Sequence, residues 1–108
     1  MKTDALLGVW TGTAHNSNDW DMKITITISG PFEIGCALGA YTIPEIPCAG
    51  TFTLLEICGQ VFELKAENKE GPCGDADSDS LELLSDDMLL YVSRGDGWEA
   101  RGVLQKAD

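Results

Sequence analysis

Residues 22–29 have the sequence MKITITIS, in which apolar and polar side chains alternate strictly. Successive side chains of a strand point to opposite faces, so the methionine and the three isoleucines fall on one side and the polar residues on the other. β-Branched residues, which occur on both sides, suit a pleated surface. The pattern therefore predicts a strand with one buried face, which ends at Gly30-Pro31.

Seven further segments predict strands joined by turn-forming residues. They cover residues 7–14, 33–43, 51–57, 61–67, 81–84, 89–93 and 98–104. Residues 44–49 contain two prolines, and we expect a loop there because proline cannot donate to a strand ladder. No segment shows a convincing helical period. Eight strands in sequence predict a single all-β domain over residues 1–108, an antiparallel up-and-down barrel, since closure removes both sheet edges.

The four cysteines fall at two ends of this predicted barrel. Cys36 and Cys58 lie near one end, and Cys48 and Cys73 lie near the other. A bridge from Cys48 to Cys58 would cross roughly 25–30 Å of strand at about 3.3 Å per residue, whereas a disulfide needs Cα atoms within about 7 Å. The spacing predicts two disulfides, Cys36–Cys58 and Cys48–Cys73, each contributing about 3 kcal/mol in the chain-entropy model.

Two other states of the cysteines stay open. A structural zinc site usually has closely spaced cysteine pairs, which this chain lacks, and four free thiols are the other alternative. An even number of cysteines in a short chain favours bridges, and bridges indicate an extracytoplasmic or secreted protein. Residues 1–8 contain no signal-peptide core or cleavage site. We therefore expect a signal that was removed or a longer parent chain.

The net charge of −11 comes from 18 acidic and 7 basic residues. Nucleic acids and anionic membranes both require a basic surface, so the charge excludes them as partners. No apolar run approaches the ~20 residues needed to span a bilayer, and we expect no direct membrane insertion. The oligomeric state does not follow from the sequence.

The first predicted strand contains Gly8-Val9-Trp10, which resembles the Gly-x-Trp signature of lipocalin-like, or calycin-type, β-barrels. The strand count and the position of Trp10 are also similar to the avidin family. The resemblance implies that Arg101, in the last strand, packs on Trp10 and closes one end of the barrel through a cation–π contact. Residues 43–50, with the later Cys73, are similar to extracytoplasmic domains of bacterial sensor or envelope proteins.

Eight short strands leave an interior that side chains fill or that holds one small ligand. The residues expected to point inward are bulky, which favours a filled core; they are Ile24, Ile26, Ile28, Phe52, Leu54, Phe62, Leu64 and Leu90. The alternative is a small apolar pocket at one mouth, lined by Tyr91 and Trp98. The inward faces of residues 81–90 stay open because their leucines break the alternation.

Three aspartates, Asp75, Asp77 and Asp79, alternate in an acidic segment that we expect to be a solvated loop. They are weak candidates for a cation site. A calcium loop would need glycine at its sixth position and glutamate at its twelfth, where this chain has Ser80 and Asp86.

The single histidine, His15, supports neither a catalytic triad nor a zinc site. The acidic residues are expected in loops rather than in an apolar cleft, so no catalytic residue, metal or cofactor is predicted. We expect a non-enzymatic binding or sensing domain that recognises a small apolar ligand or a partner protein. The alternative is a structural or interaction domain with a filled barrel.

Overall fold

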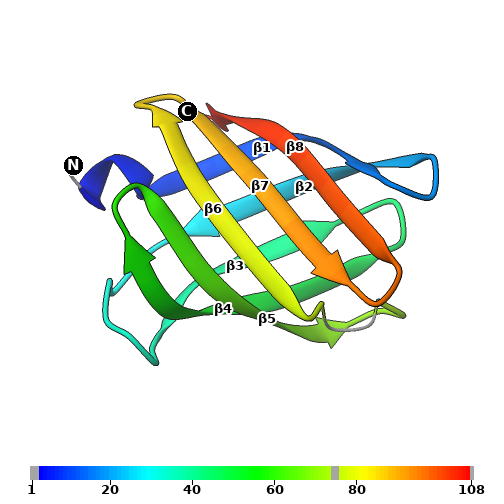
Figure 1. The fold of residues 1–108 in the computed structure, drawn as a ribbon, viewed down its shortest axis with the longest axis horizontal. Coiled ribbons are helices and arrows are strands. Elements are labelled where there is room, and N and C mark those ends of the chain that lie inside the picture. The colour runs from blue at the N-terminus through cyan, green and yellow to red at the C-terminus, as the bar shows by residue number, and fades with distance from the viewer. Residues whose placement is uncertain (1–2, 74–75, 108) are drawn as a thin grey trace.

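A computed structural model describes residues 3–73 and 76–107 of the chain. Its elements are one 3-10 turn, η1 (Thr3–Leu6), and the strands β1 (Gly8–Asn16), β2 (Trp20–Ile28), β3 (Ala37–Ile43), β4 (Cys48–Cys58), β5 (Val61–Glu70), β6 (Ser78–Ser85), β7 (Met88–Gly95) and β8 (Trp98–Ala107). The strands follow one another around a closed antiparallel barrel, as the sequence predicts (Figure 1). The turn η1 was not predicted.

The barrel closes where β1 pairs with β8 as well as with β2. In this seam Gly12 lies opposite Leu104, and a Cβ at Gly12 would come within 2.8 Å of both the Leu104 side chain and the Val103 carbonyl oxygen. Glycine therefore lets the first and last strands approach closely. The two edges that an open meander would leave unpaired are absent from this sheet.

Strict alternation in β2 places Met22, Ile24, Ile26 and Ile28 in the interior, which confirms the interpretation of that segment. The apolar and aromatic residues on the inward faces of β6 and β7 are Leu81, Leu83, Leu89 and Tyr91. The prediction that Leu90 points inward is wrong, because Leu90 alternates with buried Leu89 and Tyr91 and is only partly buried. The turn at Asp86 and Asp87 sets this register, which the leucine-rich sequence leaves ambiguous.

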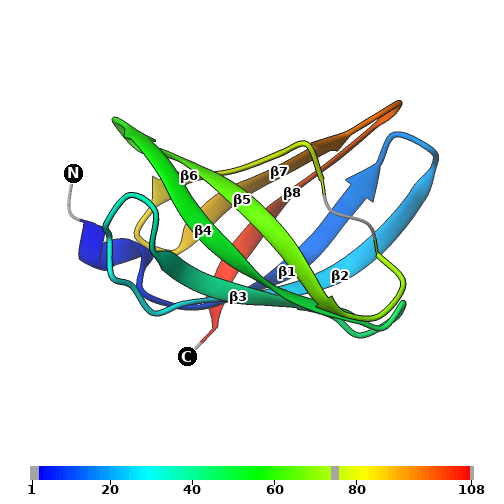
Figure 2. The same cartoon turned by 90° about the horizontal axis from the view of Figure 1, so that it is seen from below.

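One end of the barrel carries η1 (Figure 1 and Figure 2), and we call it the closed end because large apolar side chains are fully buried there. Trp10 is fully buried there, and its indole Nε1 donates to the Leu6 carbonyl at 2.9 Å. Lys106 Nζ lies 5.1 Å from the centre of the Trp10 ring and donates to the Ala5 carbonyl. Phe32 covers Phe62, with ring centroids 6.1 Å apart.

The predicted contact between Arg101 and Trp10 is wrong. Trp10 lies opposite Lys106 in the β1–β8 register, whereas Arg101 lies opposite His15, about five residues further along β1, and is exposed. The basic residue over the tryptophan is therefore Lys106. Arg101 and Lys106 are five positions apart in β8, so their side chains point to opposite faces of the sheet. Only one of the two can therefore point toward the Trp10 ring.

Cys48 and Cys73 form a disulfide with an S–S distance of 2.00 Å and Cα atoms 6.1 Å apart, as predicted. The predicted Cys36–Cys58 bridge is wrong, since both are free cysteines. β3 begins at Ala37 rather than near Glu33, and the Leu54 amide donates to the Cys36 carbonyl, so Cys36 lies beside Leu54. β4 continues four residues beyond Leu54, which places Cys58 about 13 Å further along the strand, too far for a bridge.

β4 also begins earlier than predicted. Only residues 44–47 form the connecting turn, and Cys48 and Ala49 pair with Ile43 and Thr42 of β3. Cys48 therefore sits in the ladder and is 4% exposed, which buries one half of the disulfide in the barrel wall.

Candidate functional site

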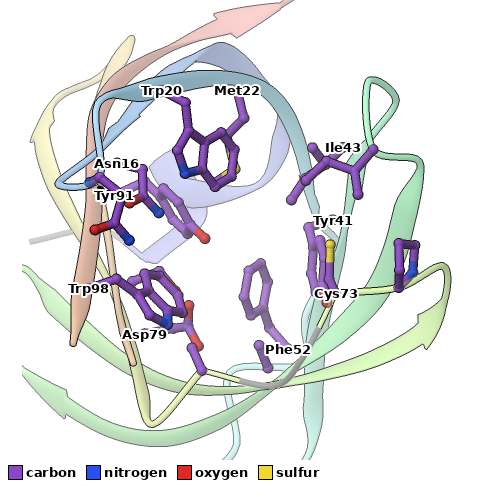
Figure 3. A pocket seen from close by; sticks show the side chains of 16 residues that line it. Asn16, Trp20, Met22, Tyr41, Ile43, Phe52, Cys73, Asp79, Tyr91 and Trp98 are labelled. Carbon is purple, nitrogen blue, oxygen red and sulfur yellow. Dashed lines mark hydrogen bonds between the residues drawn. The ribbon is translucent and has the colours of Figure 1, made fainter. Parts of the chain in front are cut away.

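The end opposite η1 contains a pocket of about 380 Å³, and we call it the open end. The side chains lining it come from all eight strands and from the turns between them (Figure 3); they are Asn16, Asn18, Trp20, Met22, Tyr41, Ile43, Ile46, Phe52, Ala66, Pro72, Cys73, Ala76, Asp79, Tyr91, Ser93 and Trp98. Side chains thus fill one half of the interior, and the other half contains the pocket. The structure therefore combines the filled core and the pocket at one mouth, which the sequence left as alternatives.

Tyr91 and Trp98, the two predicted ligand-binding residues, both line this pocket. Tyr91 is on the inward face of β7, and Trp98 begins β8. A Cβ at Gly95 would collide with the Trp98 indole, so the absence of a side chain at Gly95 lets the ring lie flat against β7. Figure 3 shows both rings on the same side of the pocket as Asp79.

The Tyr91 phenol is 5% exposed, and burial is the largest cause of a strongly raised pKa. The negative charge of Asp79 raises the pKa of Tyr91 further, while a hydrogen bond with Ser93 acts in the opposite direction. The phenol is therefore neutral at physiological pH, and its hydroxyl retains a proton that it can donate.

Tyr41 and Phe52 form the facing wall of the pocket (Figure 3). Their ring centroids are 5.1 Å apart with an interplanar angle of 40°. The Tyr41 hydroxyl donates to Asn68 Oδ1 at 3.3 Å, and Asn68 Nδ2 donates to the Gly71 carbonyl at 2.9 Å. These contacts link the wall to the β5–β6 connection and fix the orientation of the Tyr41 ring.

The rim is anchored by the disulfide on one side and by Trp20 on the other. Cys73 lines the pocket, and its amide lies 3.2 Å from Cys48 Sγ. Trp20 is 41% exposed, so a large part of its ring faces solvent at the mouth.

Asp79 is the residue of the site that the sequence interpretation placed wrongly. It is not in a solvated loop but in β6, where it lies opposite Ser93 and is 2% exposed. Asp79 shares the inward face with Leu81 and Leu83. The alternation Asp79-x-Leu81-x-Leu83 was the signal that could have identified it as an interior carboxylate.

The predicted cation candidates do not form one group. Asp75 lies outside the described residues, Asp77 is exposed, and Asp79 is buried. Within residues 3–73 and 76–107 no cluster of three or more histidine, cysteine, aspartate or glutamate residues could hold a metal ion.

His15 lies on the outer face of β1. Its Nδ1 is 2.6 Å from Asp21 Oδ1, and both side chains are more than half exposed. The β1–β2 register brings Asp21 opposite His15. His15 takes no part in the pocket lining.

No protein-family model matches the chain, and a search of curated proteins finds no match. Among the described residues, none of the helical structure is long and apolar enough to cross a membrane.

Proposed function

We propose that this protein is a non-enzymatic domain that binds a small molecule in the pocket at the open end. The observation that carries the proposal is the pocket itself. Its volume of about 380 Å³ falls within the range of small-molecule sites. Its lining combines apolar and aromatic walls with a few buried polar groups, namely Asn16, Asp79 and Ser93, which is the usual composition of such sites.

The proposal includes an extracytoplasmic location. The Cys48–Cys73 disulfide supports it, because disulfides persist in oxidising compartments. It also includes a relationship to lipocalin-like barrels. Eight strands in a closed meander and a buried Trp10 beneath a basic side chain support that relationship, although the basic residue is Lys106.

A thermal-shift screen of small molecules tests the proposed function, followed by measurements on two variants. A ligand that binds only the folded state raises its stability by RT ln(1 + [L]/Kd), about 2.7 kcal/mol at a hundred times Kd. Ala66→Phe fills the pocket from β5, where Ala66 is 6% exposed. Val103→Phe adds similar bulk at a residue of β8 that is 44% exposed and outside the pocket.

We expect ligands that stabilise the wild-type protein and the Val103→Phe variant but not the Ala66→Phe variant. Two results would contradict the proposal. One is that no small molecule shifts the melting temperature. The other is that Ala66→Phe folds and binds every ligand as the wild-type protein does, which would place binding on the outer surface.

One observation favours a second candidate function. The buried Asp79 carboxylate is close enough to the Tyr91 phenol to raise the pKa of Tyr91. Acid–base enzymes use pairs of this kind. Mass spectrometry of a bound ligand after prolonged incubation separates the two functions. Recovery of the unchanged ligand supports binding. Conversion of the ligand into a product supports catalysis if the Asp79→Asn variant no longer carries it out.

A further inference from the structure

We propose that the ligand of the open-end pocket is a small organic cation, a protonated amine attached to an apolar group, whose positive charge pairs with Asp79. This inference rests on the proposed function, since it names the ligand class of the same pocket. Three features of the lining carry it: the sign of its charge, its aromatic content and its buried oxygen atoms.

The first feature is charge. Asp79 is the only ionisable acid or base among the described lining residues, apart from the Tyr91 and Tyr41 phenols and Cys73, whose thiol is in the disulfide. None of the described lysine, arginine or histidine residues lines the pocket. Asp79 interacts with neighbouring protein groups, and its charge acts on Tyr91. An ionised Asp79 carboxylate in this apolar interior attracts a cation much more strongly than it would in water, and a bound cation in turn favours the ionised form.

The second feature is the concentration of aromatic rings. Five of the eight aromatic residues of the chain line this one pocket; they are Trp20, Tyr41, Phe52, Tyr91 and Trp98. The face of an aromatic ring attracts a cation such as a protonated amine, and several rings around one site are a known way to bind quaternary ammonium groups. In Figure 3 the Tyr41 and Phe52 rings face Tyr91, Trp98 and Asp79 across the pocket.

The third feature is the supply of buried hydrogen-bond acceptors. Asn16 and Ser93 are each 4% exposed and line the pocket. An amide oxygen and a hydroxyl oxygen can each accept a hydrogen bond from an ammonium N–H. Ser93 lies directly opposite Asp79 in the β6–β7 ladder, so one acceptor is placed next to the charge.

An organic cation fits the pocket better than a metal ion. Calcium requires six to eight oxygen ligands, whereas the described lining contains a single carboxylate and no cluster of metal-binding residues. The size of the pocket and its five rings require an apolar part on the ligand. The net charge of −11 attracts cations from solution to the mouth.

The test uses three probes of similar size and shape that differ in charge. They are 2-phenylethylammonium, 2-phenylethanol and 3-phenylpropanoate, titrated into the oxidised wild-type protein at pH 7 by isothermal calorimetry. We expect the ammonium ion to bind at least about tenfold more tightly than the alcohol, a difference of ~1.4 kcal/mol. The carboxylate is expected to bind more weakly than the alcohol because it is repelled by Asp79.

Two matched variants locate the effect. Asp79→Asn removes the buried charge, and Asp77→Asn removes the same charge from an exposed residue outside the pocket lining. We expect Asp79→Asn to abolish the preference for the ammonium ion while it retains the affinity for the alcohol. Asp77→Asn should behave as the wild-type protein does. If Asp79→Asn does not fold, the ranking of the three probes on the wild-type protein still decides the question.

The possible failures are distinguishable. If the alcohol binds as tightly as the ammonium ion, or if a folded Asp79→Asn variant keeps the preference, the cation inference is wrong and the binding function stands. Displacement of the ammonium ion by calcium chloride at equal concentration would assign Asp79 to a metal and also overturn the inference. If none of the probes binds at millimolar concentration, the cation inference is wrong, and the thermal-shift screen decides the proposed function separately.

Discussion

The closed end and the open end are built from the same eight strands, yet their inward residues differ in kind. Near η1 the inward positions carry large apolar side chains, such as Trp10, Leu54 and Phe62, which are at most 1% exposed. At the other end, the same alternation places Asn16, Asp79 and Ser93 in the interior. Only the open end contains the pocket.

This difference indicates a division of roles along the barrel axis. Burial of large apolar side chains is the main source of folding stability. A buried carboxylate or amide is costly to desolvate and contributes less. The closed end can therefore hold the sheet together while the open end carries polar groups that suit a ligand. Such residues are often retained for function at some loss of stability.

The largest expected effect comes from Trp10→Ala at the closed end. The substitution removes a fully buried indole, its hydrogen bond to Leu6 and its contact with Lys106. We expect a loss of about 3–5 kcal/mol in the free energy of unfolding, as for other core aromatic residues. Urea denaturation followed by far-UV circular dichroism measures it.

Trp20→Ala is the matched control, because it truncates the same residue type at the mouth of the open end. Trp20 is 41% exposed, and we expect a loss below about 1 kcal/mol. Equal losses for the two variants would show that the stability of the barrel is not concentrated at the closed end.

The second largest effect concerns the covalent link at the open end. The Cys48–Cys73 bridge spans 25 residues, for which the chain-entropy model gives about 3 kcal/mol. The double variant Cys48→Ala, Cys73→Ala should lose about that much stability under oxidising conditions. The double variant Cys36→Ala, Cys58→Ala should lose far less, because both residues are free thiols.

Alkylation of the denatured, unreduced protein followed by mass spectrometry provides an independent measurement. We expect two modified cysteines, Cys36 and Cys58. Complete protection of all four cysteines from alkylation would instead indicate a Cys36–Cys58 bridge, which would contradict the register of β3 and β4.

The sequence was sufficient for the barrel but not for the register of its strands. The alternation in β2, the turn residues and the number of segments led to an eight-stranded meander because they depend on local preferences. The Cys36–Cys58 pairing depended on where β3 starts and on how far β4 extends beyond it. Local preferences leave such ends uncertain by several residues, and four residues of strand exceed the reach of a disulfide.

The candidate site was predicted only in its aromatic part. Tyr91 and Trp98 were expected to line a small apolar pocket at one mouth, and both line the pocket. Asp79 was missed because its acidic neighbours suggested a loop, although its alternation with Leu81 and Leu83 belongs to a strand. Tyr41 joins the site across the barrel from Tyr91, a proximity that only the closed fold creates (Figure 3).

A smaller effect on stability is expected from Gly95→Ala. A Cβ at this position collides with the Trp98 indole and must displace the ring from β7. Overpacking of this kind costs about 1–3 kcal/mol, and we expect the lower end of that range because Trp98 is only partly buried. The displaced ring should affect the pocket more than it affects stability. We expect ligands to bind more weakly and the fluorescence emission of Trp98 to change.

The comparison variants for this prediction are Trp98→Phe and Trp98→Phe combined with Gly95→Ala. Without the indole, the added methyl group should have little further effect on ligand affinity. If Gly95→Ala weakens binding equally with and without Trp98, the collision is not the cause of the loss.

The smallest effect at neutral pH is expected from Tyr91→Phe, and it should become larger in alkali. Burial and the Asp79 charge raise the pKa of Tyr91 above its ordinary value of about 10. Above that pH the unfolded chain loses the phenolic proton while the folded protein keeps it. The folded state then binds more protons, so the free energy of unfolding falls as pH rises. The stabilising contribution is fully present below pH ~10 and is lost above it at up to about 1.4 kcal/mol per pH unit.

Phenylalanine cannot ionise, so Tyr91→Phe should lose stability more slowly than the wild-type protein above pH ~10. Urea denaturation of both proteins between pH 8 and pH 11 measures the difference. Parallel curves over this range would mean that the phenol ionises equally easily in the folded and unfolded states. The Tyr91 side of the open end would then be wet, unlike the dry packing around Trp10, and the contrast between the two ends would be weaker than the burial of Tyr91 indicates.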